Sequence, residues 1–202
     1  MEYSRRFFLE TAIAGAGSFA LRPVLANPGV TATPIAPALQ RRALAALERH
    51  GERIANRDVV GIVDFSLASD AKRFHLLNVR DGTVTSHLVA HGRGSDPEHT
   101  GWLKRFSNEP HSNATSAGAF RTDSVYIGAH GRSIRLEGLD ATNDNAAARG
   151  IVVHGAWYVS AEMVREHGVL GRSEGCFALD LASLEEVLAR LGPDRLIYAD
   201  KV

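Results

Sequence analysis

The chain has 202 residues, of which 45% are apolar and 23% charged, so it can bury one sizeable core but hardly two. Lysine plus arginine equals aspartate plus glutamate at 23 each, and this balance gives no reason to expect nucleic acid as the partner. The single cysteine excludes an internal disulfide and a cysteine-rich zinc site.

The first 26 residues have the pattern of an export signal. Arg5 and Arg6 precede a small, apolar run over residues 11–21, and Ala26 ends an acceptable cleavage site. That run, at about 11 residues, is shorter than the roughly 20 residues of a membrane-spanning helix. We therefore expect a twin-arginine signal peptide at 1–26, a periplasmic or otherwise extracytoplasmic protein, and no membrane span.

Residues 27–37 are rich in proline, threonine and alanine, which predicts a linker. Leu39, Ala43 and Leu47 then recur at helical spacing, so an amino-terminal helix is expected within 38–57. From residue 58 the character changes to short β-rich segments at 59–68, 73–79 and 83–92. An Asp-Gly turn at 81–82 joins the second of these to the third.

Residues 92–117 lack periodicity, and such a long loop in a compact domain is usually functional, so we expect it to face a substrate. Strands are predicted at 118–128 and 133–136, with a loop or short helix at 140–149. A helix capped by Asp180 should follow over 181–191, and a last strand over 195–199. The fold class is mainly β with a few peripheral helices.

The chemistry is expected between His154 and Cys176. The apolar run 151–153 predicts a buried strand that places His154 at its end, and glycines around Cys176 predict a turn that leaves the sulfur accessible. A neutral thiol is a weak nucleophile at pH 7, and an adjacent imidazole can lower the pKa of the thiol or accept its proton. Cys176 is therefore the candidate nucleophile and His154 the candidate base.

The motifs HGAWYVS (154–160) and GRSEGCFAL (171–179) resemble the signature of L,D-transpeptidase catalytic domains. Upstream matches are AHGRGS (90–95), FSN (106–108), TSAGAFRT (115–122) and the stretch 126–156. The resemblance covers roughly residues 58–200 and is greatest to a divergent, YkuD-like branch, the murein L,D-transpeptidase catalytic domain proteins. It implies a catalytic domain over 58–202 with a compact β-sandwich or barrel-like fold.

The resemblance also implies roles within the site. A backbone carbonyl after the histidine orients the imidazole, and Gly155 occupies that place. The expected oxyanion donors are the N–H groups of Gly175 and Cys176, because glycine turns let a backbone approach a ligand closely. Neither a metal nor a cofactor is expected. The candidates for substrate binding are Arg172, Ser173, His130 and Tyr158.

The resemblance implies a peptidoglycan enzyme that forms a thioester with a stem tetrapeptide and passes the acyl group to the amine of another stem. With water as the acceptor, the same site would be an L,D-carboxypeptidase, and the residues do not separate the two. Two further alternatives are a non-catalytic wall-binding module and a zinc hydrolase. The ligands of such a zinc would be His154, Cys176 and either His130 or His167, at poor spacing.

Overall fold

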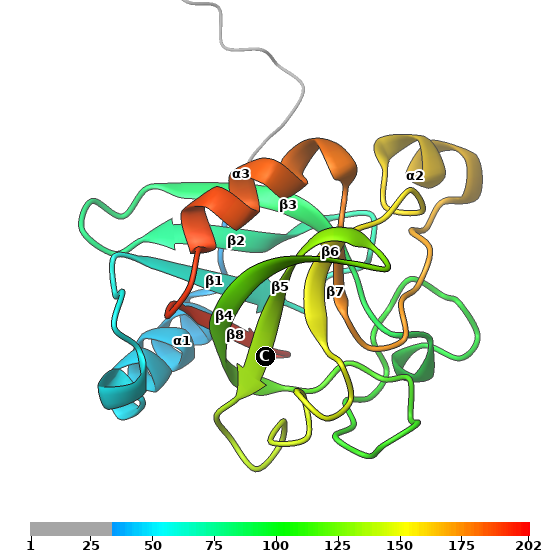
Figure 1. Cartoon of the computed structure of the whole chain (residues 1–202). Helices are drawn as coiled ribbons and strands as arrows, with labels where there is room; N and C mark the ends of the chain where they lie inside the picture. The colour runs from blue at the N-terminus through cyan, green and yellow to red at the C-terminus, as the bar shows by residue number, and fades with distance from the viewer. Residues whose placement is uncertain (1–33) are drawn as a thin grey trace, which may run out of the picture. The chain divides into compact units, whose positions relative to one another are not determined.

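A closed β-barrel with helices on its outside forms the part of the chain that the computed structural model describes, residues 34–202 (Figure 1). The signal peptide expected at 1–26 and most of the linker expected at 27–37 lie outside this range. The strands are β1 (Val59–Asp64), β2 (Lys72–Asn78), β3 (Val84–Ala90), β4 (Gly118–Gly128), β5 (Gly131–Gly138), β6 (Val152–Gly155), β7 (Phe177–Leu179) and β8 (Leu196–Asp200).

The strand order around the barrel is β1-β2-β3-β7-β6-β5-β4-β8. Two neighbouring pairs are parallel, β1 with β8 and β6 with β7, and the remaining pairs are antiparallel. The turn between β2 and β3 contains Gly82 at a φ of +74°, as an Asp-Gly hairpin turn requires. The mainly β, barrel-like fold class expected from the sequence is confirmed.

Three α-helices lie outside the barrel: α1 (Pro37–Arg49), α2 (Ala161–His167) and α3 (Leu181–Leu191). Helix α1 buries Leu39, Ala43 and Leu47 against β1 and β8, which confirms the helical spacing seen in the sequence. It ends well before residue 57, because a 3-10 turn at Gly51–Arg53 leads the chain toward β1. Helix α3 begins at its expected cap, where the Asp180 side chain accepts a hydrogen bond from Ser183 N.

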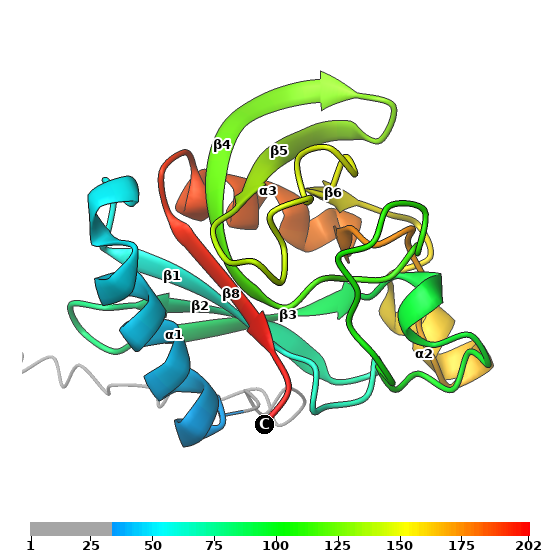
Figure 2. The same cartoon turned by 90° about the horizontal axis from the view of Figure 1, so that it is seen from below.

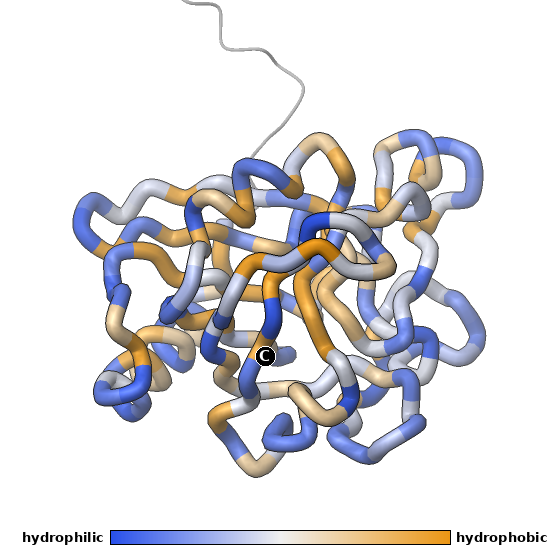
Figure 3. Tube along the Cα trace, in the orientation of Figure 1, coloured by the Kyte–Doolittle hydropathy of each residue, from blue (hydrophilic) through white to orange (hydrophobic). Residues whose placement is uncertain are grey.

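The interior of the barrel is filled by aromatic and aliphatic side chains, and Figure 3 shows the apolar colour concentrated along the strands. Phe177 lies fully buried and packs edge-on against Phe120, with ring centroids 5.3 Å apart. Because Phe177 directly follows Cys176 in the sequence, this packing fixes the backbone beside the thiol.

Long loops gather at one end of the barrel. Apart from a short 3-10 helix (Arg93–Ser95), residues 92–117 contain no helix or strand, and residues 139–151 form turns. In Figure 2 the outer parts of β4 and β5 curve away from the other strands as a long hairpin. No helix within residues 34–202 has the length and apolar character needed to cross a membrane.

Candidate active site

The segments that carry His154 and Cys176 are neighbours, because β6 ends beside β7 and Cys176 directly precedes β7. The two strands run parallel, with His154 opposite Ala178 and Val153 opposite Phe177. Cys176 lies in the bend immediately before β7, two residues before Ala178. The sequence placed the histidine near a strand end correctly, and β6 extends one residue further, to Gly155.

The His154 imidazole is buried and oriented by the backbone. Its Nδ1 lies 3.0 Å from the carbonyl oxygen of Gly155, the residue expected to orient it. With Nδ1–H donating there, the lone pair is on Nε2, which forms no hydrogen bond within the described residues. Burial lowers the pKa of His154, the Gly155 hydrogen bond raises it and the charge of His130 lowers it further, with a net decrease. The imidazole is therefore neutral at pH 7.

Cys176 is half-buried, and its Sγ lies 3.6 Å from the carbonyl oxygen of Gly150. Burial raises the pKa of the Cys176 thiol, and the Val152 N–H and the charge of Arg149 offset this only in part. His154 is not among the groups that act on the thiol, so a lowering of the thiol pKa by His154 stays a prediction.

The turn before Cys176 is held by the Ser173 hydroxyl. Ser173 Oγ donates to the Cys176 carbonyl oxygen at 2.7 Å and accepts from Gly175 N–H at 3.2 Å. Gly175 has a φ of +117°, which disfavours any residue with a β-carbon, and its backbone lies against Gly92. The Gly175 N–H, an expected oxyanion donor, is therefore engaged within the turn.

Arg172 and Ser173, both expected to bind substrate, instead make contacts within the protein. Arg172 donates to the carbonyl oxygens of Asp96 and Pro97. Ser173 is buried, and its backbone pairs with residues on either side of Gly92, through His91 O and Arg93 N. In this structure both residues fasten the Cys176 turn to the 91–97 segment.

His130 and Tyr158 do lie beside His154. The His130 ring, in the turn between β4 and β5, stacks on the His154 ring with centroids 4.2 Å apart and planes 22° apart. Tyr158 packs over Gly171, and burial raises the pKa of its phenol to about 12. A pocket of about 440 Å³ is lined by His130, His154, Gly155, Ala156, Trp157, Tyr158 and Leu181.

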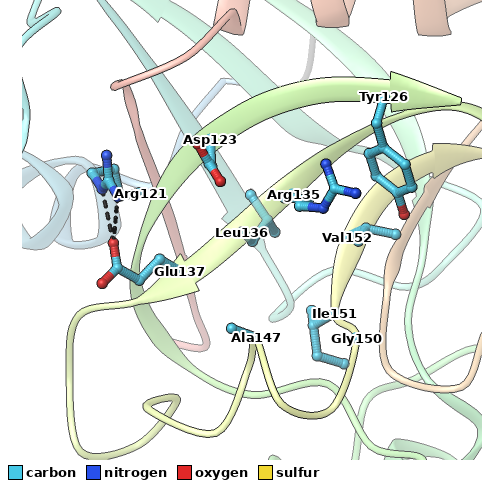
Figure 4. A pocket seen from close by; sticks show the side chains of 10 residues that line it. All are labelled: Arg121, Asp123, Tyr126, Arg135, Leu136, Glu137, Ala147, Gly150, Ile151 and Val152. Carbon is cyan, nitrogen blue, oxygen red and sulfur yellow. Dashed lines mark hydrogen bonds and ion pairs between the residues drawn. The ribbon is translucent and has the colours of Figure 1, made fainter.

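A second pocket, of about 420 Å³, lies between the β4–β5 hairpin and residues 147–152 (Figure 4). It shares Gly150 and Val152 with the surroundings of the Cys176 sulfur, so it begins within reach of the thiol. Its floor is apolar, from Leu136, Ile151 and Val152. Figure 4 shows the Arg135 guanidinium facing the Tyr126 ring, at 3.9 Å from the ring centroid.

Sequence patterns predict no role for Arg149, which the structure places against the turn before Cys176. Arg149 stands at the end of the 139–151 loop and points back into the protein. A single arginine before an apolar run is an ordinary feature of surface loops, so only its position three residues before β6, the strand that carries His154, could have drawn attention to it.

Residues 34–202 contain no group of three histidine, cysteine, aspartate or glutamate side chains arranged to hold a metal ion. His167, a ligand in the zinc alternative, is exposed at the end of α2. In the sequence it follows His154 by 13 residues. The described residues therefore do not assemble the ligand set of that alternative.

A family model described as the L,D-transpeptidase catalytic domain matches residues 32–199. Similar solved structures include an L,D-transpeptidase from Mycobacterium smegmatis, at 16% identity and a TM-score of 0.42, covering 71% of this chain and 58% of that one. A second is L,D-transpeptidase 3 from Mycobacterium tuberculosis, at 15% identity and a TM-score of 0.45. The match covers 71% of this chain and 61% of that one.

The L,D-transpeptidase from Xylanimonas cellulosilytica has 18% identity and a TM-score of 0.41, covering 78% of this chain and 68% of that one. This chain thus spans less than two thirds of the two mycobacterial proteins. No curated protein matches the sequence. Because the family model matches most of its length, the chain belongs to the L,D-transpeptidase catalytic domain family.

Proposed function

We propose that this protein is a cysteine-dependent peptidoglycan L,D-transpeptidase that acts on stem tetrapeptides through a thioester with Cys176. Family membership supports the reaction class. The observation that carries the assignment of roles is the hydrogen bond from His154 Nδ1 to Gly155 O at 3.0 Å, beside the strand that follows Cys176. It leaves Nε2 as the only ring nitrogen able to accept a proton.

In the proposed reaction the S–H bond of Cys176 breaks as its sulfur attacks the carbonyl carbon between an L-centre and the terminal D-residue. The proton moves to His154 Nε2, and the carbonyl oxygen becomes an oxyanion near the backbone N–H group of Cys176, since the Gly175 N–H already bonds Ser173 Oγ. Collapse breaks the peptide bond, His154 returns the proton to the leaving D-residue amine, and a thioester remains. An amine of a second stem then attacks the thioester and frees Cys176.

The raised pKa of Cys176 and the lowered pKa of His154 favour concerted proton transfer over a preformed thiolate-imidazolium pair. The acyl donor would occupy the pocket of Figure 4, which begins at Gly150 and Val152. His130, Trp157 and Tyr158 would line the path of the second substrate, in the pocket on the His154 side. Arg172 and Ser173 would act by holding the turn rather than by contacting substrate.

Mass spectrometry of a stem tetrapeptide, incubated with the full chain and with or without a second stem as the amine, tests the proposal. We expect loss of the terminal D-residue, a cross-linked product only when the amine is present, and loss of both with Cys176→Ala. If the shortened stem is released as a free acid even when the amine is present, water is the acyl acceptor and the enzyme is an L,D-carboxypeptidase. Inhibition by a chelator but not by iodoacetamide would contradict the thiol mechanism in favour of a metal hydrolase, and no product from folded protein would favour a binding module.

A further inference from the structure

Arg149 carries a positive charge, and no carboxylate within residues 34–202 forms an ion pair with it. Its guanidinium donates to four acceptors on the 107–116 segment, all of them uncharged carbonyl or hydroxyl oxygens. Nη1 bonds Ser107 O at 2.8 Å and Ser116 Oγ at 2.7 Å, and Nη2 bonds Ser112 Oγ at 3.2 Å and Ala114 O. The one ionisable group that acts on Arg149 is Cys176, whose charge raises the Arg149 pKa against the lowering by burial.

The same guanidinium lies against the backbone of the Cys176 turn. A β-carbon built on Gly175 would be 3.2 Å from Arg149 Nη2 and 2.8 Å from Ala114 O, which Arg149 itself binds. On the other side, the residue that follows Arg149 offers its carbonyl oxygen to Cys176 Sγ at 3.6 Å. Arg149 therefore touches the turn immediately before the sulfur, while its chain neighbour touches the sulfur itself.

Two other arginines near the Cys176 turn, Arg93 and Arg172, bind other groups. Arg93 pairs with Glu174 at 2.8 Å, and Arg172 donates to the carbonyls of Asp96 and Pro97. Four charged or titratable groups then lie around the thiol. Arg149 comes from the 139–151 loop and Glu174 from the turn itself. His154 comes from β6, and Tyr158 from the segment that follows β6. Arg149 is the cation among them at neutral pH.

We propose that Arg149 is a positioning residue whose fixed positive charge stabilises the Cys176 sulfur as its proton leaves for His154. This inference deepens the function proposed above and rests on it. A thiolate that forms in a half-buried site is costly unless an opposite charge is nearby. A cation held in place by four hydrogen bonds before the reaction needs no rearrangement when the charge develops.

The test measures the rate of iodoacetamide alkylation against pH, which reports on one sulfur because the chain has one cysteine. Arg149→Gln keeps a hydrogen-bond donor and loses the charge, whereas Arg149→Lys keeps the charge and loses the forked geometry. We expect Gln to move the inflection up by about one pH unit and to slow alkylation at pH 7 about tenfold. The inflection of the Lys variant should stay close to wild type.

The matched control is Arg105→Gln. Arg105 also forms a hydrogen bond within the 92–117 loop, to Gly94 O at 3.0 Å, but it is not among the charges that act on the Cys176 pKa. Its inflection should not move. Equal shifts in Arg149→Gln and Arg149→Lys, or no shift in a folded Gln variant, would overturn the inference in favour of a structural role. If the Gln variant does not fold, a Lys variant whose inflection lies about one pH unit above that of the wild type has the same meaning.

Alkylation needs no turnover, so the two proposals fail separately. An enzyme without transpeptidase activity whose Cys176 still responds to the charge at position 149 would contradict the proposed function alone. An active enzyme whose sulfur ignores that charge would contradict the role of Arg149 alone.

Discussion

Strand β6, which carries His154, lies between two walls that are built in opposite ways: the Cys176 turn, which leads into β7, and the β4–β5 hairpin. The Cys176 turn is anchored by the Ser173 hydroxyl, by the Arg93–Glu174 ion pair and by backbone contact with Gly92. The β4–β5 hairpin end across from it extends into solvent, with Ile127 82% exposed, and touches the site mainly through the His130 ring. A nucleophile requires fixed geometry, whereas a wall that admits a substrate does not, so the bracing is concentrated on one side.

The largest effect that we expect is a loss of folding stability in acid, caused by the buried His91 behind the fixed wall. His91, whose carbonyl oxygen accepts from Ser173 N, is buried among Arg73, Asp96 and Arg172, and burial lowers its pKa to about 3. An unfolded histidine titrates near 6.5, so between these values only the unfolded chain binds the proton and stability falls as pH falls. The loss approaches on the order of 4 kcal/mol by pH 3.

Urea unfolding at pH 7 to 4 measures this effect. His91→Gln should flatten the dependence of the unfolding free energy on pH, whereas His167→Gln, at an exposed position, should leave it unchanged. An equally steep dependence in His91→Gln and wild type would show that His91 is not the group responsible.

His154→Gln tests the base where the two walls meet. Loss of a general base typically costs on the order of 100-fold or more in rate. Since burial lowers the pKa of His154, the wild-type kcat/KM should fall on the acid side with an inflection below 6.5. The residual activity of the variant should lack that inflection, and an acid limb that persists would assign it to another group.

Gly92→Ala should damage the fixed wall. Gly92 has an ordinary φ of −70°, but a β-carbon there would lie 2.3 Å from Asn113 O and 2.7 Å from Gly175 N, both of them backbone atoms. We expect a stability loss of about 2 kcal/mol and a lower kcat, because the turn has to move. The control is Gly131→Ala in the hairpin, where nothing lies within 4 Å and only the positive φ of 74° is strained. It should leave kcat unchanged, and an equal loss of kcat in both variants would remove the contrast.

His130→Ala should have the smallest effect, because the open wall contributes one stacked ring. We expect kcat/KM to fall by less than about tenfold, the scale of an aromatic contact. The charge of His130 lowers the pKa of His154, so its removal should raise the acid inflection toward 6.5. Ile127→Ala, in the same hairpin, should alter neither quantity, and a loss above a hundredfold with His130→Ala would mean that the hairpin is part of the catalytic apparatus.

Local patterns predicted much of the fold. The spacing of Leu39, Ala43 and Leu47 located α1, and the Asp-Gly turn located the β2–β3 hairpin, because each depends on neighbouring residues. A barrel-like fold was expected only from the family resemblance, since closure depends on pairing between distant strands, which local spacing does not reveal. Within the site, His154, Cys176 and Gly155 remain predictions from the motif. The contacts of Ser173 and Arg172 inside the protein depend on the 91–97 segment, which no spacing connects to residue 173.

The last strand closes the barrel, and this has a consequence for how the chain folds. Strand β8 lies between β1 and β4, and Val60 pairs with Leu196 across most of the described sequence. Loop closure over that separation is slow, so β1 and β4 remain open edges until the final residues arrive. Open strand edges pair readily with other chains. Deletion of residues from Leu196 onward should therefore yield aggregating protein rather than a smaller soluble domain, and co-expression of the missing segment as a peptide is the natural rescue.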